Sequence, residues 1–525
     1  MITKTGSRDF ASSRLVRFAG WGLVATGVLI MSSRADEAPA DVRLTLTECV
    51  DAAIEQNLKL KVDRFGPVLA TEDLEVAKAP FDPRVEIAAN AGESKSALAS
   101  SELQGSAQPA SEQSELRASA GKQFAPGTQI RFDTSLSDFD TDSEFATLNP
   151  TIDTRADLSV TQPLLQGGGR LVNTAPIRRG EIVVRRADET LRAAVMDVAL
   201  ETELAYWGLA LAYARLEVDQ SSLDLSRSLL EETEAMAEQG LRTNVDVIQS
   251  RSDVAARMEA VILDRQRIDD TQDELWVLLG RLHQNQSIRL VGDPWPEPDM
   301  SPPSVVDSYE TALQLQPEYR ILKNQIEEQE LDVAVARRQN LPALDLSASG
   351  GFSGRDDNRK DSYDGLFARD GYNWQVDLTF KMPWGLRETE SRLHQARYRL
   401  VQGRLSLFDA DQLVLRDVRA GCRAVQAGIE RVRVTRLSRE LNGEQVRQER
   451  ARFEAGLATV RNVLDAQDDL GEARIRVLEA ERDTIGARIR LARLEGSLLQ
   501  AYGVAWNEID IERPGDYDRG RKADR

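Results

Sequence analysis

The chain has 525 residues, of which 29% are charged and only 6% are aromatic, a composition poorly suited to large compact cores. Its net charge of −19 argues against nucleic acid as a partner, because phosphate backbones repel an acidic protein. Long solvated helices fit this composition better.

Residues 1–35 are predicted to be a secretory signal peptide. Basic residues precede the apolar run 18–31, and Ser33-Arg34-Ala35 offers a small-x-small cleavage site, with Ala38-Pro39-Ala40 as the alternative. The run is shorter than the ~20 residues that a membrane-spanning helix needs, so a single anchoring helix is the less favoured reading. The mature chain is expected to be exported with a net charge of −23, because the signal removes five basic residues and one acidic residue.

A first helix is predicted over 44–79, followed by four segments in which apolar and polar residues alternate. These segments are 84–91, 115–122, 128–137 and 154–162, and each roughly suits a tilted membrane strand. Pro80 and Pro163 stand at the two joins between helix and strand, where a proline can end either hydrogen-bonding pattern. The alternative interpretation is that these prolines merely end secondary-structure elements, as prolines do in many proteins.

A long helix is predicted over 171–239, then a turn at Gly240-Leu241 and a return helix over 242–290. Heptad-spaced Leu204, Leu211, Val218 and Leu225 mark the expected seam of the long helix. At ~1.5 Å per residue, about 70 residues give roughly 100 Å of helix, which is long enough to cross a periplasm. A proline-rich segment at 294–303 then separates the return helix from the next one.

The second half is predicted to begin with a helix over 304–341 and strands over 343–350 and 372–382. Pro342 and Pro383 again stand at the joins. In the second strand the apolar residues occupy one face without interruption, and they are Tyr372, Trp374, Val376, Leu378, Phe380 and Met382. A helix over 386–455 with a heptad seam, a Gly456-Leu457 turn and a return helix over 458–502 complete the half.

The two halves are duplicates of one unit. Residues 239–248 align with 455–464 at an offset of 216, and Gly, Leu, Thr and Val recur in place. The predicted division is a signal peptide at 1–35, repeats at 36–303 and 304–502, and a C-terminal tail at 503–525. The first half carries a surplus between its strand-flanking prolines, which is either an extra hairpin, 115–122 with 128–137, or a folded-back outer loop.

The alternating strands predict a membrane barrel that needs several chains. The links 93–114, 138–153 and 351–371 are long and polar whereas 124–128 is tight, the pattern of outer-membrane barrels, with a soluble sandwich as the alternative. So few strands cannot close a cylinder from one copy, and open edges are not tolerated in hydrocarbon.

Residues that carry enzyme chemistry are scarce. The only histidines are His283 and His394, and the sequence has neither a Cys/His metal cluster nor a phosphate-binding loop. Cys49 and Cys422 are the only cysteines and are expected to be buried thiols rather than a disulfide. We therefore expect no enzyme, no cofactor and no metal site.

Together these features resemble the TolC-type outer membrane efflux and secretion channel family. The resemblance covers nearly the whole mature chain and rests on the segments 161–168, 240–249 and 452–467. It implies an α+β membrane protein, a homotrimer with a β-barrel in outer-membrane lipid and a coiled-coil helical tunnel in the periplasm. The tunnel would dock a periplasmic adaptor protein and an inner-membrane transporter; the cargo and the particular pump are left open. A periplasmic coiled-coil scaffold is the alternative function.

The resemblance also implies roles for residues at the tunnel tip. The tip turns fall on Gly240, Leu241, Gly456 and Leu457, and the two glycines are expected to take a conformation that tolerates no Cβ atom. The aperture residues are Asp246, Asn462 and Asp465. The family often has Asp-Val-Leu-Asp here, so Asn462 weakens any cation-selective ring, and Asp465 is either a lumen-lining charge or a solvated surface carboxylate. The family usually has four strands per protomer, whereas the alternating segments of this chain allow six.

Overall fold

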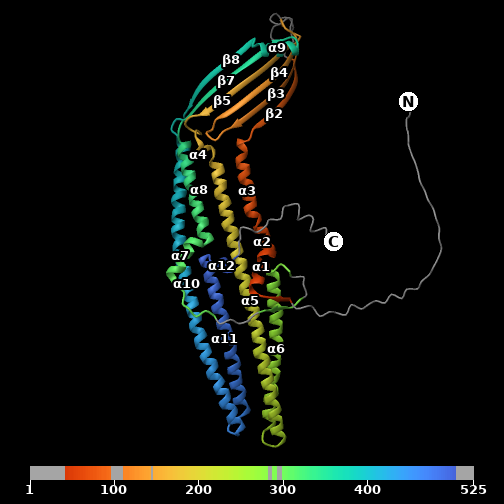
Figure 1. The fold of residues 1–525 in the computed structure, drawn as a ribbon, viewed down its shortest axis with the longest axis vertical. Coiled ribbons are helices and arrows are strands. Elements are labelled where there is room, and N and C mark those ends of the chain that lie inside the picture. Colours follow the sequence, from red (N-terminus) through yellow and green to blue (C-terminus); the bar gives the residue numbers. More distant parts are fainter. Residues whose placement is uncertain (1–41, 96–109, 143–145, 282–285, 292–297, 504–525) are drawn as a thin grey trace, which may run out of the picture.

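A computed structural model describes residues 42–95, 110–142, 146–281, 286–291 and 298–503. The predicted signal peptide and residues 504–525 lie outside these ranges. The chain forms a long rod with a sheet at one end and two helical hairpins at the other (Figure 1). Within the described residues, no helix combines the length and apolar character required to cross a membrane.

The N-terminal strut is broken into short helices rather than formed by one. It comprises α1 (Leu46–Gln56), α2 (Leu58–Asp63) and α3 (Phe65–Lys78), and the short 3-10 helix η1 (Ala79–Phe81) leads into the sheet. The break after α1 is set by Asn57, whose side chain accepts a hydrogen bond from the Leu60 amide at 3.1 Å and so caps α2.

A small parallel pair of strands was not predicted. It joins β1 (Val42–Leu44) to β6 (Ile288–Leu290). The predicted helix over 242–290 is therefore too long, because α6 (Asn244–Leu278) ends before Gly280, which takes a positive φ of 69°.

The main sheet has six antiparallel strands in the order β2-β3-β4-β5-β7-β8. Their bounds are β2 (Arg84–Lys95), β3 (Ala110–Gln123), β4 (Gln129–Thr141), β5 (Thr151–Pro163), β7 (Ala343–Asp356) and β8 (Gly371–Lys381). The extra hairpin of the first half, β3 with β4, is thus an integral part of the sheet and not a folded-back loop. The predicted link 351–371 was wrong, since it holds the end of β7 and a helix, α9 (Arg359–Ala368).

The strand register gives the sheet one apolar face and one polar face. A single cross-strand row on the apolar face contains Val85, Ala120, Phe132, Leu158, Gly350 and Trp374. The row beside it on the polar face contains Glu86, Ser119, Asp133, Asp157, Gly351 and Asn373. Because side chains alternate along every strand, the separation extends across all six strands.

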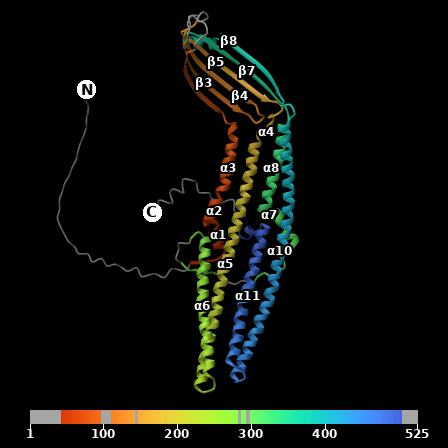
Figure 2. The same ribbon diagram turned by 180° about the vertical axis from the view of Figure 1, so that it is seen from behind.

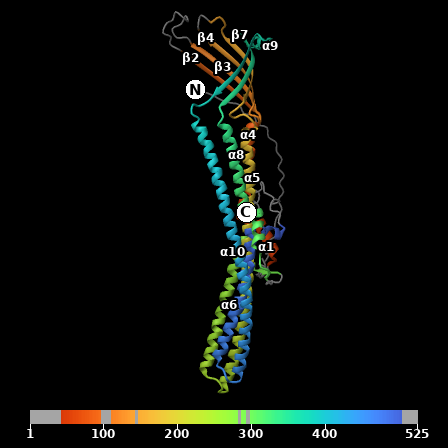
Figure 3. The ribbon, with the colours of Figure 1, turned by 90° about the vertical axis from the view of Figure 1, so that its left-hand side faces the viewer.

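The helices repeat the same order in both halves. In the first half, α4 (Arg170–Asn173) and α5 (Ala175–Glu238) leave the sheet and α6 returns; in the second, α10 (Arg387–Glu454) leaves and α11 (Val460–Glu495) and α12 (Leu498–Tyr502) return. The second-half strut is α7 (Val305–Leu315) followed by α8 (Pro317–Gln339). Figures 2 and 3 show the two long hairpins running side by side toward the end opposite the sheet.

The largest apolar cluster lies at the middle of the rod, where α1, α5 and α6 pack together. It includes Val50, Met196, Leu209 and Leu275 along with Cys49. Both cysteines are free and buried, as predicted.

The two predicted heptad seams fared differently. On α10 the seam is confirmed, because Val414, Val418, Val425 and Val432 are buried. On α5 it is wrong toward the tip, where Leu225 is 38% exposed and Ser226 and Thr233 are buried instead. The Ser226 hydroxyl donates to the Asp253 carboxylate of α6, and the Thr233 hydroxyl donates to the Leu229 carbonyl of its own helix.

Candidate functional site: two helical tips and a two-faced sheet

Both tip turns are closed by the same glycine-dependent cap. Gly240 has a φ of 74° and Gly456 a φ of 73°, both in the left-handed region. The Leu241 amide donates to the Met236 carbonyl at 2.9 Å, and the Leu457 amide donates to the Arg452 carbonyl at 2.8 Å. This is the hydrogen-bond pattern of a Schellman motif. A Cβ atom added to either glycine would meet open space, so the restriction comes from backbone conformation and not from crowding.

The first helical turn after each tip is capped by a threonine. Thr243 caps α6, and the Asp246 carboxylate accepts from the Thr243 amide at 3.0 Å in a capping box. At the equivalent place in the second repeat, Thr459 caps α11 and its hydroxyl accepts from the Asn462 amide at 3.4 Å. Asp246 and Asn462 therefore have a local structural role, and Asn462 stands where the first repeat has an acid.

Asp465 lies one turn further along α11, with its side chain exposed. Its carboxylate is 3.7 Å from the Arg461 guanidinium in an exposed i,i+4 pair. Exposure agrees with either a lumen-lining or an outer-surface position. The neighbouring cation offsets part of any negative field at this position.

Arg242 joins the two tips and was not singled out from the sequence. Its guanidinium lies 4.1 Å from the centre of the Phe453 ring and donates to the Ala458 carbonyl at 3.3 Å and the Phe453 carbonyl at 3.2 Å. Phe453 is buried together with Leu229 and Val460. The available signal was the alignment itself, since Arg242 is matched by an alanine, Ala458, in the other repeat.

Large apolar side chains project from both tips. Leu241 is 69% exposed and Leu457 is 74% exposed, and Val245 and Ile248 on α6 are exposed as well. Exposed apolar residues grouped at the end of a rod are typical of a protein–protein contact surface.

The four predicted junction prolines lie where helices and strands meet. Pro80 lies in η1, Pro163 ends β5, Pro342 immediately precedes β7, and Pro383 follows β8. Figure 1 shows the helices meeting the sheet at one end of the strands.

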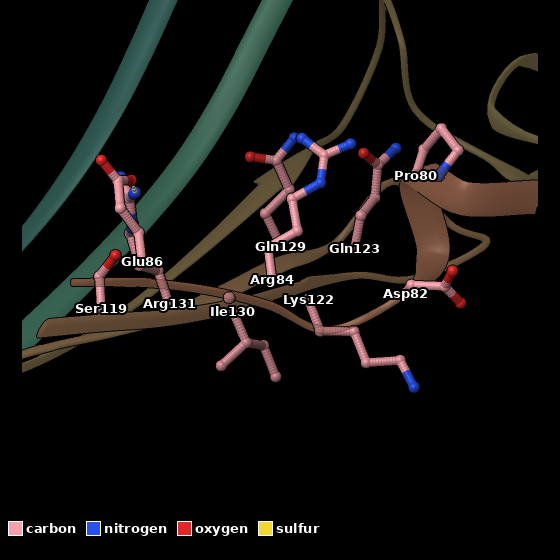
Figure 4. Close-up of a pocket in the computed structure, with 11 residues that line it drawn as sticks. Pro80, Asp82, Arg84, Glu86, Ser119, Lys122, Gln123, Gln129, Ile130 and Arg131 are labelled. Carbon is pink, nitrogen blue, oxygen red and sulfur yellow. Dashed lines mark ion pairs between the residues drawn. The ribbon is translucent and has the colours of Figure 1, made fainter.

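The polar face of the sheet is hollowed near these junctions. A cavity of about 360 Å³ is lined by residues of β2, β3 and β4. In Figure 4, Arg84, Gln123 and Gln129 project to one side of the sheet, whereas Ile130 and Lys122 project to the other.

Several charged side chains on the polar face are paired. Arg131 lies 4.0 Å from Glu86 and 3.6 Å from Asp133, and Arg355 makes two hydrogen bonds to Asp153, at 2.6 and 2.9 Å. This face is suited to contact with water, and its basic and acidic side chains lie next to one another.

A two-faced sheet in line with long helical hairpins is the architecture of a membrane channel protomer. The chain belongs to the outer membrane efflux protein family, whose model matches residues 49–281 and 308–497. A curated relative is the alkaline protease secretion protein AprF of Pseudomonas aeruginosa, 24% identical over 398 residues, which cover 75% of this chain and 79% of AprF.

Solved outer-membrane channels share the fold. The CmeC channel of Campylobacter jejuni matches with a TM-score of 0.59 and 14% identity, covering 91% of this chain and 88% of CmeC. The MtrE channel of Neisseria gonorrhoeae, in its open state, matches with a TM-score of 0.57 and 16% identity, covering 89% of this chain and 91% of MtrE.

Proposed function

We propose that three copies of this chain form an exit duct in the outer membrane for efflux or secretion. The sheets would close into a barrel in the lipid, and the helices would extend the duct through the periplasm. The duct would be a passive conduit, opened at its tip when a periplasmic adaptor linked to an inner-membrane transporter docks there. The observation that carries the proposal is the apolar face that continues across all six strands.

The height of the apolar band supports a membrane location. Along β8 the apolar face runs from Tyr372 to Phe380, and Tyr372, Trp374 and Phe380 are strongly exposed. Eight residue steps of ~3.3 Å give about 26 Å along the strand, which a tilt of roughly 40° reduces to about 20 Å of height, within the ~25 Å apolar band of outer-membrane barrels. A periplasmic scaffold would leave this band in water, which argues against that alternative.

The edges of the sheet support closure by further copies. β2 and β8 are the outermost strands of the described sheet. β2 runs away from the helices and β8 runs back toward them, so β8 of one copy and β2 of the next would pair antiparallel, like every other neighbour in the sheet. Three copies would supply eighteen strands, and a barrel widens roughly linearly with its number of strands.

The outer helices carry exposed apolar residues below the same two edges. On α10, which continues from β8, these are Tyr398, Val401, Leu405 and Phe408. On the strut that leads into β2, they are Val62, Leu69 and Val76. Both sets follow heptad spacing, as expected for helices that pack against a partner.

The tips supply the surface for the adaptor. We assign docking to Gly240, Leu241, Gly456 and Leu457, since the glycine turns present both leucines to solvent. Asp246, Asn462 and Asp465 would surround the aperture between the three copies.

Disulfide trapping between the sheet edges tests the proposal. In a chain with Cys49 and Cys422 replaced by alanine, Ile87→Cys on β2 is combined in turn with Trp374→Cys, Val376→Cys and Leu378→Cys on β8. Oxidation in membranes should link one of these pairs into a series of covalent species that ends at three chains, while Ile87→Cys alone should remain monomeric on denaturing gels. A series that continues past three chains, or no linkage from any pair, would contradict a closed trimer.

A further inference from the structure

The helix α9 lies at the end of the sheet farthest from the long helices (Figure 1). It packs on β7 and β5 and covers the end of their apolar face, because its contacts include Thr154 and Gly354. These two residues pair with each other, and their row lies next to the row that contains Phe352 and Tyr372. α9 is therefore about 7 Å beyond the aromatic edge of the apolar band, on the same side of the sheet.

α9 is held firmly against the strands. The Thr154 hydroxyl donates to the Ser362 carbonyl at 2.8 Å, and the Ser362 hydroxyl donates to the Ile152 carbonyl at 2.9 Å, with Thr154 and Ser362 both fully buried. A Cβ atom at Gly354 would lie 2.6 Å from the Leu366 amide nitrogen, so the helix backbone rests directly on β7. The helix thus has a fixed position on the sheet.

The opposite side of α9 presents an aromatic and charged surface. Ser362, Gly365 and Leu366 are the buried side, and Phe367 is 81% exposed. At 100° per residue, Lys360 and Asp364 share the Phe367 side, with Tyr363 beside them, also exposed. Leaving a phenylalanine ring in water forfeits on the order of 2 kcal/mol of burial free energy, so this surface favours an apolar partner.

Two neighbouring contacts place more aromatic and basic groups at this level. The Arg369 guanidinium lies 5.2 Å from the centre of the Phe352 ring. Tyr372 begins the apolar face of β8 just after α9 ends and is itself exposed. Aromatic rings next to lysine and arginine are the combination found at the boundary between acyl chains and headgroups.

We propose that α9 is an interfacial helix that lies in the headgroup region of the outer leaflet and fixes the depth of the barrel there. Phe367 and Tyr363 turn toward the acyl-chain boundary, and Lys360 reaches the headgroups. Acidic and basic side chains are equal in number along α9, so its net charge does not attract it to the membrane. The proposed contact with lipid depends on the aromatic residues of α9 and on its fixed position on β5 and β7. The inference rests on the proposed barrel, because only then does lipid cover this face of the sheet.

Nitroxide labels at three positions test the inference. In the cysteine-free chain reconstituted in lipid vesicles, Phe367→Cys is compared with Val376→Cys in the middle of the apolar face and with Gln375→Cys on the polar face. Accessibility to oxygen and to a water-soluble nickel chelate is measured for each label. All three native side chains are exposed, so the substitutions leave the packing of the sheet unchanged.

The expected ratio of oxygen to nickel accessibility at position 367 is several-fold above that at 375 and below that at 376. If 376 is buried in lipid while 367 matches 375, α9 lies in water and the inference is wrong although the barrel stands. If 367 is as deep as 376, α9 is a core-spanning rather than an interfacial element, and the inference also fails. If 376 is itself in water, both the barrel and the inference fail.

Discussion

Asp264, an acidic residue within α6, is only 2% exposed. Its Oδ1 lies 2.7 Å from the Arg267 guanidinium and 3.5 Å from the Nε of Arg215 on α5. Arg215 also lies 3.4 Å from Glu479 on α11, so one guanidinium serves acids of both hairpins. Burial raises the pKa of Asp264 to about 6. The neighbouring Asp219 also raises this pKa, whereas Arg215 and Arg267 lower it.

This raised pKa predicts a stability that falls as the pH rises. The unfolded carboxyl titrates near pH ~4, so between about pH 4 and 6 the folded chain keeps a proton that the unfolded chain has released. Stability should fall through this window and level off above it. Asp264→Asn should remove this contribution and stabilise the fold at neutral pH by on the order of 1–3 kcal/mol.

Thermal unfolding followed by circular dichroism in detergent, at about pH 5 and about pH 7.5, measures the effect of this group. The control is Asp269→Asn, an exposed acid on the same helix, which should keep the parental pH dependence. An Asp264→Asn chain with an unchanged pH dependence would show that this carboxyl is ionised in the fold throughout the window.

At the scale of elements, Arg242 connects the α5–α6 hairpin to the α10–α11 hairpin through Phe453. Arg242→Ala should remove the ring contact and two hydrogen bonds to carbonyls, a loss of about 1–3 kcal/mol at the tips. Amide hydrogen exchange should therefore accelerate in residues 450–464, with Arg242→Lys intermediate because lysine keeps the charge but not the planar geometry.

The matched control is Arg447→Ala, which removes an exposed i,i+3 pair with Glu444 on the same helix as Phe453. It should leave exchange at the tips unchanged, because such surface pairs contribute little. Equal protection of 450–464 in the Arg242→Ala and parental chains would mean that the hairpins hold together without Arg242.

Elements whose residue pattern repeats several times were predictable from the sequence, whereas short elements were not. The unbroken alternation of β8 and the heptads of α10 identified both elements, since each pattern extends over three or more repeats of its period. By contrast, β1 and β6 are three residues long each, and α9 depends on the Asn358 cap and on a contact between Ser362 and Thr154 of β5, 208 positions away. The contact of Arg242 with Phe453 joins residues 211 positions apart, which the sequence pattern does not reveal.

At the scale of the whole molecule, the proposed closure into a barrel depends on two sheet edges that a neighbouring copy would have to cover. Helix α10 faces its own chain with Leu393, Ala396 and Val418, which are buried, and faces outward with the exposed Leu405 and Phe408. Each sheet edge leads into a helical edge, because α10 follows β8 after a short link and α3 precedes β2 through η1. A single contact between copies would therefore involve strand pairing and helix packing together, so damage to the helical part should weaken the whole trimer.

Leu405→Asp tests this coupling, because it places a charge in the exposed seam of α10 without touching the packing inside the chain. Burying an aspartate where a leucine packed should cost on the order of 2 kcal/mol or more at each contact between copies. Samples in mild detergent that are heated stepwise before electrophoresis should then dissociate at a lower temperature than the parental assembly. Ser406→Asp, on the same turn but about 100° away around the helix, should leave dissociation unchanged. If both variants dissociate like the parent, the seam faces water in the assembly, and the copies meet through the sheet edges alone.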